Sequence, residues 1–273
     1  SILGGQPFFY TTLFFVIYSG LIYAGIKAIS RSEFIFSSLK FLIFAALIIS
    51  VTAFFRAGNI EPGSFSISAL FFPYGIVLFS FLGFPAIPEA RELLVGEEKS
   101  LRKTLVVSTI LPAAVYALFA LFFVGGLGRN IDEIAVVTLG AIGGVQFILG
   151  FAFAFLCMTT AYLSLGLALQ EVYEYDYRIR HNLSFLLACA IPYLLIILGV
   201  RSFIKTIGLV GAVGGGIVGI LIILMFQLAK KKGDRNPEYA MKKSRVLLWL
   251  IVALLSAGII YEIIFVFWPG SLP

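Results

Sequence analysis

The chain has 273 residues, of which 60% are hydrophobic and only 12% are charged, and its mean hydropathy is +1.05. A soluble domain carries about a quarter charged residues and could not bury so much apolar surface, so a soluble fold is excluded. The long apolar runs lack the alternation of membrane β-barrels, and we therefore expect an all-α transmembrane protein. The net charge of +6 follows from basic loops beside the membrane and does not indicate a nucleic-acid partner.

Eight apolar segments of about 20 residues or more are predicted to span the bilayer. Most lysines and arginines lie in the loops after the first, third, fifth and seventh spans, so these loops are expected in the cytoplasm and both chain ends outside. The opening at Ser1 without a signal-peptide pattern predicts a fragment or a processed chain. The predicted spans are residues 8–28, 36–55, 73–96, 103–127, 143–170, 183–200, 204–229 and 246–268.

Lys40 is a charged residue inside the second predicted span. It lies about six residues into the span, which places it roughly 9 Å deep at 1.5 Å per residue. A lysine at this depth can extend back to the headgroups, or it can point inward so that its ammonium group takes the place of a bound cation. Its position alone leaves both interpretations open.

The third span carries residues that interrupt a helix in the middle of the membrane. Pro85 and Pro88 each remove a backbone donor, and Gly83 permits dihedral angles that other residues avoid. Two half-helices, 73–82 and 88–96, are predicted on either side of an unwound stretch. Backbone groups freed at this depth can bind a substrate or an ion, as in the broken helices of transporters. A simple proline kink is the alternative.

The fifth span contains two adjacent hydroxyl groups, those of Thr159 and Thr160, with Ser164 one turn further on. Adjacent hydroxyls can hold Na⁺ or bind a substrate. The alternative is that each hydroxyl donates to a carbonyl of the preceding turn, which is the usual arrangement in membrane helices.

Other residues in the spans are given structural interpretations. Glu262, near the outer end of the last span, is expected at the membrane interface. Cys157 and Cys189 lie in apolar runs and are expected to be unpaired, buried residues. Five glycines of the seventh span are expected to allow close helix packing; they are Gly211, Gly214, Gly215, Gly216 and Gly219.

Three segments together resemble one family. Residues 78–89 read Leu-Phe-Ser-Phe-Leu-Gly-Phe-Pro-Ala-Ile-Pro-Glu and resemble the broken sixth helix of the amino acid–polyamine–organocation superfamily. Residues 96–104 resemble the stretch between its helices six and seven, and residues 155–166 are similar to its eighth helix. Within the superfamily, the resemblance is to the branch that contains aromatic amino acid and tyrosine/tryptophan permeases.

The resemblance implies a leucine-transporter-like fold, in which two five-helix repeats have inverted orientations. The eight spans would be helices 4 to 11 of a single transmembrane domain covering residues 1–273. Residues 8–55 would be the remainder of the first repeat, 73–229 the second repeat and 246–268 an additional helix. Helices 1 to 3 would be absent, and these missing helices of the same protein would complete the substrate site.

The resemblance also implies site residues. Carbonyl groups around Phe79, Ser80 and Phe81 would receive the α-amino group of a substrate, close to Gly83. Phe81 or Phe84 would be an aromatic gate.

An ion site is implied as well. Thr159 and Thr160, with the carbonyl of Leu156, match the groups that hold Na⁺ in sodium-coupled relatives. Lys40 resembles the lysine whose amine occupies that position in proton-coupled relatives, and depth arithmetic allows Lys40 to reach Thr160.

The function implied is symport of neutral amino acids, aromatic or branched, across the plasma membrane. The coupling ion would be H⁺ or Na⁺, with no other cofactor. A membrane-embedded enzyme is the first alternative, but an enzyme is not expected, because the spans contain no aspartate to hold Mg²⁺ and the single histidine, His181, lies in a predicted loop. A channel or a non-transporting sensor with the same fold is the second alternative.

Overall fold

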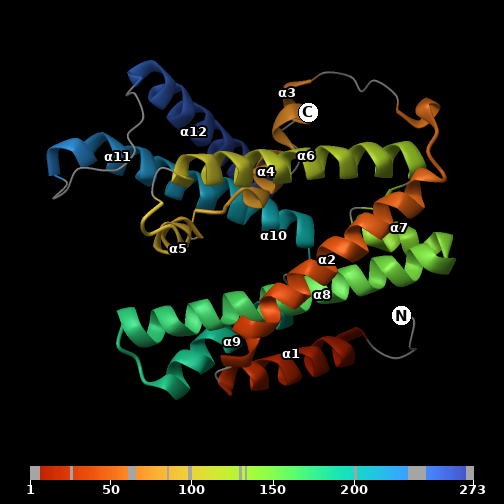
Figure 1. Ribbon diagram of the computed structural model, residues 1–273, viewed down its shortest axis with the longest axis horizontal. Coiled ribbons are helices and arrows are strands. Elements are labelled where there is room, and N and C mark those ends of the chain that lie inside the picture. The colour runs from red at the N-terminus through yellow and green to blue at the C-terminus, as the bar shows by residue number, and fades with distance from the viewer. Residues whose placement is uncertain are drawn as a thin grey trace. The chain divides into compact units, whose positions relative to one another are not determined.

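The computed structural model describes residues 7–24, 27–60, 66–84, 86–97, 100–128, 131–132, 134–199, 202–232 and 244–268. Regular structure in this part of the chain is entirely helical (Figure 1). The prediction of an all-α membrane protein is confirmed, because five helices are long and apolar enough to cross a membrane. They are Ile35–Thr52, Leu101–Leu127, Gly144–Asp176, Phe203–Ala229 and Arg245–Phe267.

The other three predicted spans coincide with shorter apolar helices, at Phe8–Tyr23, Ala69–Ser80 and His181–Ile197. The second helix begins at Lys27, well before the predicted residue 36, because a helix can continue past the apolar stretch that marks a span. The hydropathy of the sequence therefore located the membrane-embedded part of this helix but not its start.

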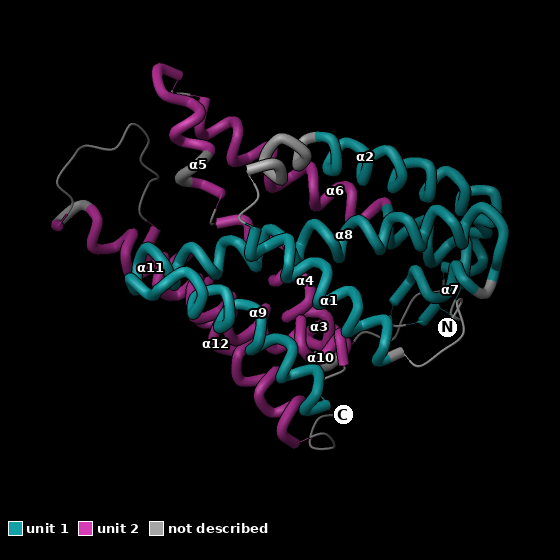
Figure 2. Tube along the Cα trace, turned by 90° about the horizontal axis from the view of Figure 1, so that it is seen from below, with its two compact units in different colours: residues 1–61, 119–201 teal, residues 62–118, 202–273 magenta. Residues whose placement is uncertain are grey.

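The described chain divides into two compact units, coloured separately in Figure 2. Unit 1 contains residues 1–61 and 119–201, and unit 2 contains residues 62–118 and 202–273. Each unit is thus built from two stretches that are far apart in the sequence. One helix, α6 (Leu101–Leu127), begins in unit 2 and ends in unit 1.

Unit 1 is arranged around α8 (Gly144–Glu171), which contacts four other helices of the unit. The contact between α8 and α2 runs along both helices, as the green and orange ribbons of Figure 1 show. A π-helical turn, η3 (Val172–Asp176), continues α8. The remaining elements are α1 (Pro7–Tyr23), α2 (Lys27–Thr52), η1 (Ala57–Asn59), α7 (Ala135–Ile142) and α9 (His181–Ile197).

Two apolar clusters form the interior of unit 1. Leu47, Val51, Phe123 and Leu139 pack together where α2, α6 and α7 meet. Ile22, Leu163 and Cys189 form the second cluster, between α1, α8 and α9. Cys157 and Cys189 are both free thiols, as predicted.

The helix α7 was not predicted as a separate element. It is joined to α8 through Gly143, whose φ of 76° lies in the left-handed region that favours glycine. This glycine ends one apolar helix and allows the next to begin, which hydropathy alone does not reveal.

Unit 2 has α12 (Arg245–Phe267) packed against α4, α10, η4 and α11. The predicted seventh span is one continuous helical segment of three parts, and its middle part, η4 (Val210–Gly215), is π-helical. The other elements of the unit are α3 (Ile67–Phe71), α4 (Tyr74–Ser80), α5 (Ala86–Leu93), the first part of α6, α10 (Phe203–Leu209) and α11 (Gly216–Lys232).

Glycines bring the helices of unit 2 into backbone contact. A Cβ at Gly75 would overlap the carbonyl of Gly208, and a Cβ at Gly211 would overlap the carbonyl of Gly75. Small residues permit such approaches in membranes. The predicted packing role is confirmed for Gly211, Gly215, Gly216 and Gly219, whereas nothing lies closer than 4.0 Å to a Cβ at Gly214.

Candidate functional site

Lys40 and Thr160 meet inside unit 1, where α2 packs on α8. The Lys40 ammonium nitrogen, Nζ, donates a hydrogen bond to Thr160 Oγ1 at 3.0 Å. Thr160 Oγ1 in turn donates to the carbonyl of Leu156 at 2.8 Å. The hydroxyl therefore bonds back to its own helix, as the structural interpretation predicted, and it also accepts a hydrogen bond from the lysine.

Thr159 differs from its neighbour. Its side chain is only 9% exposed, and its hydroxyl has no hydrogen-bond partner within the described part of the chain. The structure thus brings Lys40, Thr160 and the Leu156 carbonyl together, and it places an unsatisfied hydroxyl one residue away. A buried hydroxyl without a partner is uncommon in folded proteins.

The surroundings of Lys40 supply little negative charge. Among the described residues, no carboxylate forms an ion pair with Lys40. The same residues contain no group of three histidines, cysteines or acidic residues suited to a metal ion. An ammonium group inside a membrane protein without a counter-ion is costly, and such groups are usually functional.

The third predicted span is broken in unit 2. Helix α4 ends at Ser80 and α5 begins at Ala86, so the proline-kink alternative is wrong and two half-helices are present. They are shorter than the predicted 73–82 and 88–96. Residues 81–84 between them are non-helical, and Pro85 lies outside the described residues.

The carbonyl groups at the break already accept hydrogen bonds. The Phe79 carbonyl accepts from the Leu82 amide at 3.1 Å, and the Phe81 carbonyl accepts from the Gly83 amide at 2.7 Å. The Ser80 carbonyl accepts from the hydroxyl of Tyr116, on α6, at 3.3 Å. The Phe79 carbonyl is also reached by the Phe81 amide, whereas those of Ser80 and Phe81 each keep a second lone pair that a substrate amino group can use.

Aromatic side chains surround the break. Phe79, Phe81 and Phe84 are each more than a third exposed, and the ring of Phe81 meets that of Tyr116 edge-on, with 5.6 Å between centroids. Gly83 is exposed, with open space where a side chain would lie. The break therefore presents apolar aromatic surface together with backbone oxygen atoms.

Glu262, which was expected at the membrane interface, is buried in the interior of unit 2. Its side chain is only 4% exposed, and one carboxylate oxygen lies 2.6 Å from the position that a Cβ at Gly208 would take. Distance from a helix end indicates depth but not the face of the helix. The residue lies on the face of α12 that packs against α10.

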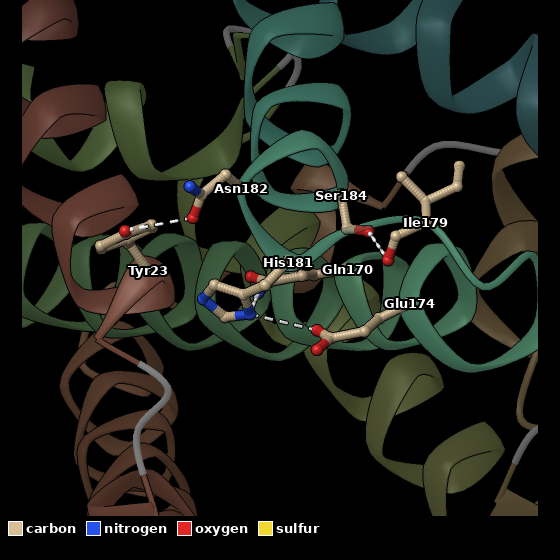
Figure 3. Close-up of polar contacts among 7 residues, drawn as sticks. All are labelled: Tyr23, Gln170, Glu174, Ile179, His181, Asn182 and Ser184. Atoms are coloured by element: carbon tan, nitrogen blue, oxygen red, sulfur yellow. Dashed lines mark hydrogen bonds and ion pairs between the residues drawn. The ribbon is translucent and has the colours of Figure 1, made fainter.

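A polar cluster that sequence reasoning missed lies where α8 ends and α9 begins (Figure 3). Gln170 is 4% exposed, and its amide nitrogen lies 3.2 Å from Nδ1 of His181. The same ring nitrogen is 3.2 Å from a carboxylate oxygen of Glu174. In Figure 3, Tyr23 of α1 donates to Asn182 beside this cluster.

The position of a proton decides which contact of His181 forms. A ring nitrogen with a lone pair accepts from the Gln170 amide, whereas a protonated one donates to Glu174. His181 was predicted in a loop but is the first residue of α9. The spacing of Gln170, Glu174 and His181 around a helix end was the available signal.

No protein-family model, curated protein or solved structure matches this chain. Two features of the molecule bear on its function, the lysine–threonine contact in unit 1 and the broken span in unit 2.

Proposed function

We propose that the protein is a secondary active transporter of neutral amino acids, driven by proton movement rather than by Na⁺. The single observation that carries the proposal is the hydrogen bond from Lys40 to Thr160. The family resemblance makes this position the ion site of related transporters. The plasma membrane and a leucine-transporter-like inverted repeat belong to the same proposal.

The preference for protons follows from charge. Two positive charges about 4 Å apart repel by about 4 kcal/mol at an effective dielectric constant near 20. A sodium ion on the Thr160 hydroxyl would lie that close to the Lys40 ammonium. The ammonium therefore takes the place of the metal ion, and loss of its proton changes the charge of the site.

The broken span supports a neutral substrate. Residues 79–84 are apolar or hydroxylic, without a carboxylate to hold a cationic side chain. Backbone oxygens at the break suit an α-amino group, and the phenylalanines suit an aromatic or branched side chain. The Tyr116 hydroxyl on the Ser80 carbonyl occupies a position that a substrate amino group would share.

The test is uptake of labelled phenylalanine, leucine, lysine and glutamate by the purified protein in liposomes. We expect a pH gradient to drive uptake of the two neutral substrates without Na⁺. In Lys40→Ala, the response of uptake to the pH gradient should become smaller, while exchange of labelled for unlabelled substrate continues. Lys103→Ala, which changes an exposed lysine on α6, is the matched control and should retain the response.

Three results would contradict the proposal. Uptake that ignores both pH and Na⁺ gradients would exclude ion coupling. An unchanged pH response in Lys40→Ala would exclude Lys40 as the coupling group. Substrate binding without any uptake would favour the sensor over the transporter.

A further inference from the structure

A buried carboxyl group in unit 2 is not used by the proposed function. Glu262 belongs to α12, and only 4% of its surface is exposed to solvent. Within the described residues, no hydrogen bond or ion pair to Glu262 is formed. Its carboxyl group lies directly against the backbone of α10 at Gly208.

Among the described residues, no basic side chain on the elements packed against Glu262 forms an ion pair with it. Tyr74 of α4 lies over Gly258, one turn before Glu262, and its buried hydroxyl has no partner among the described residues. Lys205 of α10 is exposed and forms no ion pair there. Tyr261 is adjacent on α12 and stacks on Phe265. Of the remaining neighbours, η4 has no ionisable residue, and α11 has only lysines 230–232, at its far end.

An ionised carboxylate in this position would be costly, because burial removes its hydration and no positive charge replaces it. A metal cation would need several oxygen ligands around it. At Gly208 there is no room even for a methyl group, because its carbon would lie 2.6 Å from a carboxylate oxygen of Glu262. A proton is the cation that fits.

The helices that pack around Glu262 also contact the broken span. A Cβ at Gly211, in the π-helical turn η4, would lie 2.8 Å from Cβ of Phe79. A Cβ at Gly215, the last residue of η4, would lie 3.0 Å from the Leu82 side chain. Phe79 and Leu82 flank the break, and π-helical turns are frequent at functional sites. A continuous set of contacts therefore leads from the Glu262 carboxyl to the proposed substrate site.

We propose that Glu262 is a second proton-binding site and that its occupancy controls the packing of η4 against the broken span. When the proton leaves, the O–H bond of the carboxyl breaks and the proton passes to water. The resulting carboxylate then moves away from Gly208, which loosens the contact of α12 with α10. The coupling part of this inference rests on the proposed transport function, whereas the proton site itself does not.

The proton can be detected by infrared spectroscopy of the purified protein at neutral pH. A protonated carboxyl has a C=O stretching band that a carboxylate lacks. We expect this band in the spectrum of the wild type minus that of Glu262→Gln. The matched control is Glu92→Gln, which changes an exposed glutamate of α5 and should show no such band. Absence of the band for Glu262 would overturn the proposal.

A second measurement uses only the wild-type protein, so it does not depend on the folding of a variant. Dicyclohexylcarbodiimide is apolar and adds to protonated carboxyl groups inside membranes, and mass spectrometry locates the adduct. We expect it on Glu262, while a water-soluble carbodiimide modifies Glu92 instead. Modification of Glu262 by the soluble reagent alone would show an ionised, water-accessible group and contradict the proposal.

Coupling is tested by the accumulation ratio in liposomes with the membrane potential held at zero. One pH unit drives about tenfold accumulation for each coupled proton, so two sites give about 100-fold. Glu262→Gln should lower this to about tenfold, whereas Glu92→Gln should not. An unchanged ratio would overturn the coupling role. Complete lack of uptake by the wild type would overturn the transport function, while the infrared band would still decide the proton site.

Discussion

Two neighbouring threonines show how far the environment of a single residue determines its role. Thr160 has a hydroxyl that is fully used, with one bond to its own helix and one from Lys40. Thr159 has a buried hydroxyl that is not used at all. The two residues are of the same type, and only the packing of α2 on α8 makes the hydrogen bonding of their hydroxyl groups different. The lysine contact was predicted from the family resemblance, and the depths of the two residues along their helices allowed it.

Thr160→Val tests the contact at the level of one atom. The variant leaves the Lys40 ammonium without its hydroxyl partner, which should cost about 1 kcal/mol of stability. Thr109→Val is a matched control, because Thr109 donates to the carbonyl of Leu105 at 2.8 Å in the same way. Thermal unfolding in detergent compares the two. Equal losses in both variants would show that the lysine contact contributes nothing.

The pair formed by His181 and Glu174 is partly exposed, with 43% and 32% of the side chains accessible. Pairs at such positions contribute about 0.2–1 kcal/mol and weaken with salt. At a pH where the His181 ring is protonated, Glu174→Gln should therefore reduce stability slightly at low salt and not at high salt. Denaturant unfolding at two ionic strengths measures this. A loss that is independent of salt would contradict the ionic interpretation.

At the scale of the elements, the sequence predicted where a helix is interrupted better than it predicted which face of a helix is buried. Pro85 and Pro88 predicted the interruption between α4 and α5, because a proline lacks the backbone donor of a helix whatever its surroundings are. The π-helical turns η3 and η4 were not predicted, since they depend on contacts between distant helices rather than on local residues. For the same reason Glu262 was assigned to the interface when it is in fact buried.

Gly211→Ala and Gly214→Ala compare two glycines of the same turn. A methyl group at Gly211 would overlap the Gly75 carbonyl, whereas one at Gly214 meets nothing closer than 4.0 Å. We expect Gly211→Ala to lose about 1–3 kcal/mol and Gly214→Ala to remain near the wild type. Thermal unfolding of both variants and of the wild type in the same detergent measures these losses of stability. A larger loss for Gly214→Ala would mean that η4 does not pack on α4 as described.

At the scale of the whole molecule, hydropathy was sufficient for the class of protein and for the approximate positions of the helices. It was not sufficient for the site, because Lys40 and Thr160 are separated by 120 positions and meet only through tertiary packing. Their meeting was inferred from the family resemblance together with the depth arithmetic.

The division of the chain into interleaved units has a consequence for the synthesis of the protein. Neither unit is complete until late in translation, because unit 1 needs residues up to 201 and unit 2 needs the segment after 202. Helix α2 enters the bilayer long before its partner α8 is made, so Lys40 spends that interval without the Thr160 hydroxyl. Assembly of unit 1 then supplies this hydroxyl when α8 is inserted.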